Sequence, residues 1–273
     1  MKDYVLICQK KEIELLDVFI SICKKHGLEY FLCGGTLIGA MRHAGFIPWD
    51  DDIDVMLPKA DFKKFLRVVE GELPPEMMLK TCKKCPGYTE LIPKIMFVNS
   101  FVCEPWTKVQ EPSGIFIDIF PIEEFPKLTD RLRKILVLAL SFTWHRPRKR
   151  LARAHKSVFG LLGDVPIVLF LQSCHAFLRC VTTVLRWVLP TIWRTSPEFA
   201  TCKTEAVYED VFPLAQHEFE GRMCNVPRHA DICLRAHYGD WTQLPPESER
   251  DSKHVIFADG EHAPHETHWE KYR

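Results

Sequence analysis

A run of aspartates early in the chain is the first group of residues whose types and spacing suit chemistry. It covers Asp50–Asp54, with Ile53 as its one apolar member, and leads into the apolar segment Val55–Leu57. Because alternate residues of a strand face opposite sides, we expect Asp52 and Asp54 on one face. Adjacent carboxylates repel unless a cation lies between them, and Mg²⁺ or Mn²⁺ takes such oxygen ligands while leaving positions for substrate phosphates. We predict a metal site there; a solvated acidic turn is the alternative.

A further carboxylate stands alone in an apolar run. Asp118 is the one charged residue of Gly114–Pro121, a segment with the composition of a buried strand. A lone charge in such a strand is costly to bury unless it is paired or bound to a metal ion. We predict that Asp118 is a third metal ligand or a general base. The alternative is an aspartate that binds backbone groups at a strand end.

Two adjacent glycines form the third feature. Gly34-Gly35-Thr36 follows a short apolar strand, Tyr30–Cys33, and precedes a helical stretch that extends to His43. We expect Thr36 to be the N-cap of this helix. Backbone N–H groups at a helix start are a ready site for phosphate. A Gly-Gly pair alone is usually only a turn, so this prediction depends on the acidic run that follows.

The apolar periodicity predicts the elements that hold these residues. Helices are expected from about Val5 to Lys25 and from Lys59 to Glu70, where apolar residues recur every three to four positions. The further expected strands are Met78–Cys82, Leu91–Val98 and Ile115–Phe120. This order of elements predicts an α+β core, with α/β as the alternative.

A basic and apolar segment follows this core. Residues 131–197 hold twelve Lys or Arg and one acidic residue, a net charge of +11, although the whole chain is neutral with 36 basic and 36 acidic residues. Such charge segregation indicates an anionic surface as partner. Residues 165–178 carry no formal charge, but these fourteen residues fall short of the ~20 that a membrane-spanning helix needs.

The same segment has the pattern of an amphipathic helix. A narrow polar stripe recurs at steps of three and four: Gln172, His175, Arg179, Thr182 or Thr183, and Arg186. A helix in a membrane interface, with Trp187 and Trp193 as anchors, fits this pattern. An internal helix that packs on the core or on a second subunit fits it equally. Nucleic acid is not expected as a partner, because exposed aromatic residues are not interleaved with the basic ones on a polar surface.

Composition narrows the class of protein. An apolar fraction of 47% and a charged fraction of 26% are those of a globular chain. Eleven cysteines cannot all pair, and Cys82 and Cys85 form the one C-x-x-C spacing, so free thiols are favoured over a zinc site. Met1–Lys11 shows no signal-peptide pattern. We expect a cytoplasmic protein, which would contact the inner face of a membrane if the insert is the interfacial helix.

Three blocks of the sequence resemble the LicD family, which includes bacterial phosphocholine transferases and, more distantly, fukutin-type ribitol-phosphate transferases. The most specific block is Phe31–Asp54, which contains Gly-Gly-Thr-Leu-Ile-Gly-Ala-Met-Arg-His and Gly-Phe-Ile-Pro-Trp-Asp-Asp-Asp-Ile-Asp. The other two are Gly114–Pro121, and Tyr238–Trp241 with Leu244–Pro246, Arg250 and His254 beyond it. The resemblance implies the nucleotidyltransferase (polymerase-beta-like) fold with a mixed sheet.

The resemblance also implies an activity. A LicD-type enzyme is expected to transfer a phospho-alcohol, such as phosphocholine, from a CDP-linked donor to a hydroxyl of a glycan or of its lipid-linked precursor. The glycan is a cell-surface one, of the lipopolysaccharide or teichoic acid type. The alternative is a nucleotidyltransferase that moves NMP from an NTP and releases pyrophosphate. A catalytically inactive scaffold at a membrane is disfavoured, because it has no use for three clustered carboxylates.

The expected roles fall on these positions. By the family motif, the metal ligands are Asp52 and Asp54, with Asp50 contributing. The residues expected at the donor phosphates are Gly34, Gly35, Thr36, Arg42 and Lys94. The residues expected to contact substrate are Trp49, Asp240, Trp241 and Arg250. The two tryptophans would stack on a base or on a choline head group, although ordinary packing explains them as well.

The sequence thus predicts three parts. Residues 1–130 form the catalytic core, residues 131–200 a basic amphipathic helical insert, and residues 201–273 a loop-rich C-terminal part that completes the site.

Overall fold

A computed structural model describes residues 3–81, 84–85, 88, 92–103, 114–154, 158–197, 205–252, 255 and 257–259. The helices are α1 (Asp3–His26), α2 (Gly34–His43), α3 (Lys59–Val68), α4 (Asp130–Ala154), α5 (Val158–Val188), α6 (Tyr208–Val211) and α7 (Ala230–Tyr238), with 3₁₀ turns at Val69–Gly71 and Glu247–Glu249. The strands are β1 (Phe31–Leu32), β2 (Asp54–Pro58), β3 (Met77–Lys80), β4 (Lys94–Phe97), β5 (Phe101–Cys103), β6 (Phe116–Pro126), β7 (Thr191–Thr195), β8 (Glu205–Ala206), β9 (Ala215–Phe219), β10 (Arg222–Val226) and β11 (Phe257–Asp259).

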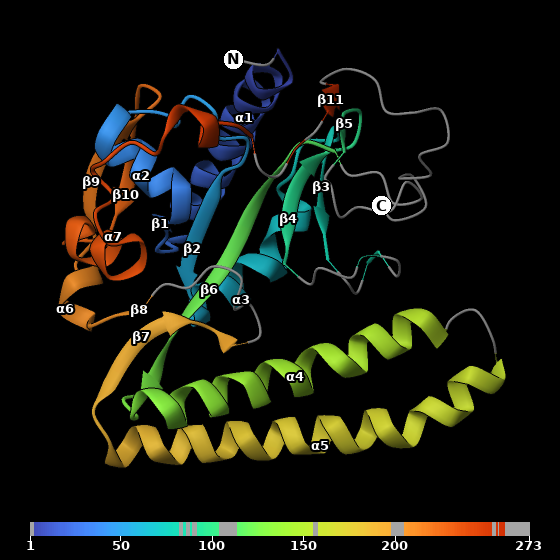
Figure 1. Ribbon diagram of the computed structural model, residues 1–273. Helices are drawn as coiled ribbons and strands as arrows, with labels where there is room; N and C mark the ends of the chain where they lie inside the picture. The colour runs from blue at the N-terminus through green and yellow to red at the C-terminus, as the bar shows by residue number, and fades with distance from the viewer. Residues whose placement is uncertain are drawn as a thin grey trace.

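A seven-stranded mixed sheet forms the centre of the molecule (Figure 1). Its order is β1-β2-β6-β4-β3, and β7 pairs with the second half of β6 and with β8. β2 and β6 are parallel, whereas β1–β2, β4–β6, β3–β4 and β6–β7 are antiparallel. A mixed sheet whose helices do not alternate regularly with its strands is an α+β arrangement, so the predicted fold class is confirmed at this level.

Helices α1 and α3 cover one face of the sheet. Leu15, Leu16 and Phe19 of α1 are fully buried and belong to one cluster with Phe65 of α3 and Val55 of β2. Burying each large apolar side chain contributes roughly 1.5–3 kcal/mol. This packing fixes the position of β2 relative to α1 and α3, and therefore the position of the aspartates at the start of β2.

The opposite face is apolar along most of its length. Met56 of β2 and Phe120 of β6 pack there with Phe31 of β1 and Cys233 of α7. Because side chains alternate along a strand, the residues two positions before Met56 and Phe120 lie on this same face. Those residues are Asp54 and Asp118, so the two carboxylates lie at one end of an otherwise apolar surface.

Most of the predicted core elements are confirmed, with one local error. The first helix and the strands of the core appear within a few residues of their predicted bounds. The predicted N-cap at Thr36 is wrong, because α2 begins at Gly34 and its N-cap residue is Cys33. The Thr36 hydroxyl accepts a hydrogen bond from the backbone N–H of Asp54 instead (2.9 Å). Cys82 and His254 lie outside the described residues.

The C-terminal part contains more regular structure than predicted. Residues 205–238 include the antiparallel hairpin β9–β10 and the helices α6 and α7. The many prolines and glycines of this part favoured loops in the prediction, but in the structure they stand at the ends of helices and strands. Gly221 adopts φ +72° in the turn of the hairpin, and Gly239 follows the last residue of α7. Among the described residues of this part, the loop-rich description fits residues 239–252.

The predicted insert is a helical hairpin placed between two paired strands. The chain leaves the sheet at the end of β6, passes through α4 and α5 side by side, and returns as β7, which pairs with β6 (Figure 1). Residues 191–195 thus belong to the central sheet, although the predicted boundary at residue 200 assigned them to the insert. The division of the chain into three parts stays a prediction.

Candidate active site

Four charged residues form one row across the central sheet. Asp54 of β2 lies opposite Asp118 of β6, Asp118 lies opposite Lys94 of β4, and Lys94 lies opposite Lys80 of β3. Directly opposite residues on neighbouring strands point to the same face. The strand register therefore brings together two of the predicted carboxylates and one predicted cation, with Lys80 as an addition.

The centre of this row is buried. Lys94 is 2% exposed, Asp118 is 8% exposed, and their Nζ and Oδ1 atoms are 3.5 Å apart. The ammonium group of Lys94 also lies 3.3 Å from the centre of the Phe116 ring, a cation–π contact. A buried charge requires such partners, so Lys94 is positioned to balance the charge of Asp118.

The loop before β2 holds a separate group of carboxylates. One oxygen from each of Asp50, Asp51 and Asp52 lies within 4.8 Å of the others, and this is the group of metal-ligand type found in the part of the chain that the structure describes. Asp52 lies just outside β2, which begins at Asp54, so strand alternation does not relate these two residues as predicted. The structure gathers Asp52 with Asp50 and Asp51, and pairs Asp54 with Asp118.

The glycine pair explains why the loop and the strand come so close to α2. A Cβ atom on Gly34 would lie 2.6 Å from Oδ2 of Asp54, and one on Gly35 would lie 2.7 Å from Oδ2 of Asp50. Gly34 also has φ +59°, which favours glycine. Both carboxylates therefore rest against the first residues of α2, where the positive end of the helix dipole lies.

The C-terminal segment anchors this loop. The carboxylate of Asp51 accepts hydrogen bonds from the hydroxyl of Ser252 and from the backbone N–H of Val255 (2.6 Å to the latter). Next to it, the guanidinium of Arg250 lies 5.7 Å from the centre of the Trp49 ring. Two predicted substrate-contact residues, Trp49 and Arg250, thus contact each other beside the acidic loop.

A sixth acid, Glu12 of α1, adjoins the aspartates. Its side chain is 2% exposed, and its Oε2 atom has no hydrogen-bond partner among the described residues. Burial raises the pKa of Glu12 well above its usual value, and the negative charges of Asp52, Asp51, Asp50 and Asp118 raise it further. The site therefore carries more negative charge than the neighbouring lysines balance, which is the electrostatic situation that a divalent cation relieves.

Replacing Glu12 with glutamine should stabilise the metal-free protein by an amount that grows with pH. A raised folded-state pKa means that the folded chain keeps a proton which the unfolded chain releases above its own pKa, about 4.3. Wild-type stability therefore falls relative to that of Glu12→Gln as pH rises above this value, by up to about 1.4 kcal/mol per pH unit until the folded-state pKa is reached.

Urea unfolding in EDTA at a series of pH values measures this difference. Glu14→Gln is the matched control, because Glu14 lies on the same helix and is exposed beside Lys11. Parallel pH profiles for wild type and Glu12→Gln would contradict the raised pKa.

Three other predicted site residues lie away from the acidic loop. Arg42 stands at the opposite end of α2 from Gly34, about 12 Å along the axis, and donates to the carbonyl oxygens of Trp241 (2.8 Å) and Gln243 (3.3 Å). Trp241 donates through Nε1 to Asp231 (3.0 Å), and Asp240 accepts from Thr242 and Gln243. These residues join α2 to the end of α7.

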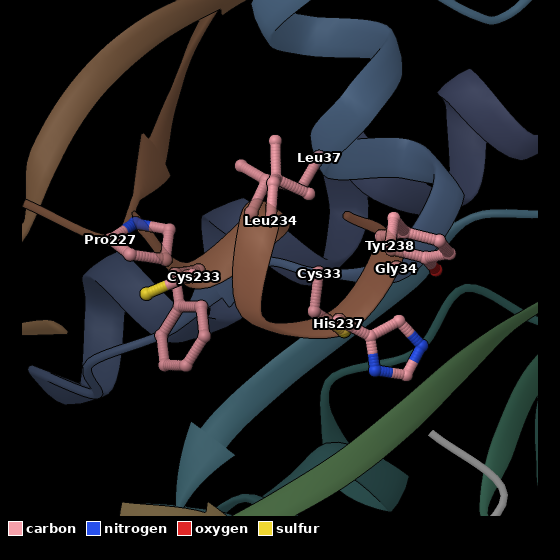
Figure 2. A pocket seen from close by; sticks show the side chains of 9 residues that line it. Cys33, Gly34, Leu37, Pro227, Cys233, Leu234, His237 and Tyr238 are labelled. Atoms are coloured by element: carbon pink, nitrogen blue, oxygen red, sulfur yellow. The ribbon is translucent and has the colours of Figure 1, made fainter. Parts of the chain in front are cut away.

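A small cavity lies between α2 and α7. Figure 2 shows its lining by Cys33, Gly34 and Leu37 on one side and by residues of α7, among them Leu234 and His237, on the other. Its volume is about 20 Å³, which suffices for about one water molecule. The cavity is a packing space next to Gly34 and is too small for a nucleotide or an alcohol head group.

Sequence reasoning missed three residues of the site. Glu12 is one of several acids on an amphipathic helix, but it stands four positions from both Cys8 and Leu16, so a charge within the apolar stripe was the available signal. Lys80 carried a usable signal, because it is a charge inside a predicted apolar strand, as Asp118 is. Asp51 was treated as part of the acidic run, whereas its side chain is committed to the C-terminal segment.

Replacing Lys94 with methionine should destabilise the protein by about 3 kcal/mol, because Asp118 then loses a charged partner in a buried position. Urea unfolding measures the loss. The double variant Lys94→Met/Asp118→Asn should regain part of it, since no unbalanced charge remains at the two positions. Strict additivity of the two single changes would show that the 3.5 Å contact carries no coupling.

The residues of the acidic loop and of the charged row lie in a segment that matches a known protein family. Residues 27–133 match the family described as LicD/FKTN/FKRP, nucleotidyltransferase domain. This range holds the acidic loop and the whole charged row. The resemblance of the sequence to the LicD family is confirmed, and the family match contains two of the three sequence blocks.

Individual relatives extend this finding. The chain is 26% identical over 265 residues to the lipopolysaccharide cholinephosphotransferase LicD of Haemophilus influenzae. The aligned segment covers 93% of this chain and 96% of that protein. A shorter match to human ribitol 5-phosphate transferase FKRP is 38% identical over 48 residues, 18% of this chain and 10% of that protein. An uncharacterised protein of Rickettsia prowazekii is 46% identical over 41 residues, 15% of each chain.

Proposed function

We propose that this protein transfers a phospho-alcohol, of the phosphocholine kind, from a CDP-activated donor to a hydroxyl of a cell-surface glycan or its lipid-linked precursor. Two relatives, a cholinephosphotransferase and a ribitol 5-phosphate transferase, support this class of reaction. The observation that carries it is the register of β2 and β6, which sets Asp54 opposite Asp118 beside a loop of three further carboxylates.

The proposal includes a divalent cation, Mg²⁺ or Mn²⁺. The residues present fit such an ion, because carboxylate oxygens are the hard ligands it takes and the acidic loop brings three of them within 4.8 Å. Asp50 and Asp52 of this group would hold it. Asp51 already accepts two hydrogen bonds, so Asp54, whose carboxylate also lies against the start of α2, is the third ligand that we propose. When bound, the ion would offset the negative charge of the donor diphosphate and of the departing CMP.

The chain's own residues supply the remaining steps. The oxygen of the acceptor hydroxyl forms a bond to the phosphorus that carries the alcohol. The bond between that phosphorus and the oxygen of the departing CMP breaks. The Asp118 carboxylate accepts the hydroxyl proton as general base. Lys94, 3.5 Å from Asp118, holds this carboxylate in place. The first residues of α2, Gly34 and Gly35, present backbone N–H groups and the helix dipole to the donor phosphates.

We also propose the nucleotidyltransferase fold for the domain. The family description supports it, as does the arrangement of a glycine corner, a short helix and a carboxylate-bearing strand next to a second one. The same carboxylates would serve the alternative reaction, the transfer of NMP from an NTP, so the released product distinguishes the two.

Phosphorus NMR of the full chain with Mg²⁺, CDP-choline, CDP-ribitol, CDP-glycerol and CTP, each with a crude glycan acceptor extract, tests the proposal. We expect CMP from one CDP-alcohol and none from the Asp118→Asn variant. Pyrophosphate released from CTP would overturn the proposal in favour of nucleotidyl transfer. Turnover that persists with EDTA would overturn the metal assignment alone.

A further inference from the structure

The helical hairpin α4–α5 exposes an unusual amount of apolar surface. Of the nineteen large apolar residues that are exposed in the described part of the chain, twelve belong to this hairpin. On α5 the most exposed are Leu169, Phe170, Phe177, Val184, Trp187 and Val188, and Trp187 is 89% exposed. Residues at such helical spacing form one continuous face. Monomeric proteins rarely leave a contiguous apolar face of this extent in water.

The second helix adds to this surface. On α4, Leu132, Ile135, Leu138 and Phe142 are each more than half exposed and recur every three to four residues. The opposite side of α4 is the packed one, because Leu140 is fully buried with Phe125 of β6 and Ile192 of β7. The hairpin therefore has a small apolar contact with the sheet and larger apolar stripes that face away from it.

The polar side of α5 faces the protein instead of the solvent. Arg179 pairs with Glu123 at the end of β6 (2.8 Å), and Lys59 pairs with the other oxygen of the same carboxylate (2.8 Å). Arg186 pairs with Glu124 (2.5 Å). Charged residues of α5 thus bind the central sheet while large apolar residues point outward. A helix in water has the reverse orientation, so the outer face of α5 is shaped for an apolar environment.

The same ion pairs decide how the hairpin meets that environment. Residues 165–188 are long and apolar enough to cross a bilayer by length and composition. In this fold, however, Arg179 and Arg186 tie α5 sideways to the catalytic body through Glu123 and Glu124, so α5 lies alongside that body (Figure 1). A helix bound in this way lies along a membrane surface instead of crossing it.

The charge of the hairpin distinguishes between two partners that could cover its apolar face, a second copy of the chain and a lipid bilayer. The hairpin and its flanks, residues 131–197, carry a net charge of +11, and the rest of the neutral chain carries −11. Arg179, Arg186 and Arg194 pair with carboxylates of the sheet, but the other nine of the twelve basic residues lie at 131–156. A second copy of the chain would bring two strongly basic hairpins together, which like-charge repulsion opposes. A bilayer with anionic head groups offers hydrocarbon for the apolar face and negative charge for the basic residues.

We propose that the α4–α5 hairpin lies flat in the interface of an anionic lipid bilayer, with Phe170, Phe177 and Trp187 inserted among the acyl chains. This surface lies at the far end of β6 from Asp118 and does not depend on the proposed reaction. The hairpin thus holds the catalytic domain at a membrane surface while leaving the acidic loop clear of the lipid.

Flotation of the full chain with vesicles tests this proposal. Vesicles of phosphatidylcholine mixed with phosphatidylglycerol are compared with vesicles of phosphatidylcholine alone. The variant Phe170→Gln/Phe177→Gln/Trp187→Gln removes three inserted side chains from positions that are 67%, 68% and 89% exposed, so little packing is lost. The matched control, Leu6→Gln/Met223→Gln/Ile232→Gln, removes three exposed apolar side chains elsewhere.

We expect wild type and control to bind the mixed vesicles, and the hairpin variant to bind about 100-fold more weakly or worse. Binding to the mixed vesicles should weaken with added salt, and pure phosphatidylcholine should bind less. No vesicle binding, or equal binding by the hairpin variant, would overturn the proposal. So would a dimer that the hairpin substitutions dissociate in the absence of vesicle binding, because the face would then be a subunit interface. Equal binding to both vesicle types would overturn the requirement for anionic lipid.

Discussion

Replacing Asp54 with asparagine should reduce turnover at least about 1,000-fold, equivalent to about 4 kcal/mol of transition-state stabilisation. Asparagine has nearly the same shape as aspartate, so its side chain still fits against Gly34. The backbone N–H of Asp54 keeps its hydrogen bond to Thr36, and β2 keeps its register with β6. What disappears is one negative charge at the end of the apolar face, opposite Asp118.

Turnover by CMP release and stability by thermal unfolding together test this expectation. Asp130→Asn is the matched control, since Asp130 is an exposed aspartate at the start of α4. We expect the control to retain full turnover. Asp54→Asn should lose turnover while its unfolding temperature stays at or above that of wild type, because a repulsive charge has been removed. Retained turnover in Asp54→Asn would refute the role proposed for this carboxylate.

Replacing Gly34 with alanine should both destabilise the protein and reduce its turnover. At φ +59° an alanine costs about 1–2 kcal/mol relative to glycine. Its Cβ atom would also lie 2.6 Å from Oδ2 of Asp54, so the carboxylate or the start of α2 must move. A displacement of about 1 Å at a catalytic group lowers rates about 100-fold. We therefore expect a loss of this size in turnover on top of the loss of stability.

Gly27 supplies a control for the backbone part of this effect. It also has φ +59°, and no atom lies within 4 Å of the position that its Cβ would occupy. Gly27→Ala should therefore lose a similar amount of stability through backbone strain and keep its turnover. If Gly34→Ala and Gly27→Ala behave alike in both measurements, the close approach of Asp54 to Gly34 has no catalytic consequence.

The part of the site that could be predicted rests on short-range patterns. Asp118 could be found because a single charge in an apolar strand is costly to bury, and Asp54 because it begins a strand whose other residues are apolar. The helices and strands of the core could be predicted from the spacing of their apolar residues. Each of these signals lies within about ten residues of sequence.

The remaining features depend on register and on long-range packing. That Asp118 stands between Asp54 and Lys94, with Lys80 next in the row, follows from strand order, which local patterns do not determine. The inward position of Glu12 depends on where α1 crosses the sheet. The polar stripe of α5 was visible in the sequence, but the side on which it would lie was not, because Glu123, its partner for Arg179, belongs to a strand.

The anchor of Asp51 sets an order of events in biosynthesis. Asp51 and Val255 are 204 positions apart, and at roughly 5–20 residues per second a ribosome takes about 10–40 s to make the chain between them. During that interval the acidic loop has emerged, but the segment that holds it has not been made. A chain that stops before Ser252 carries the aspartates of the loop without their anchor. Only a polypeptide that has been extended past this point has all the contacts that position them.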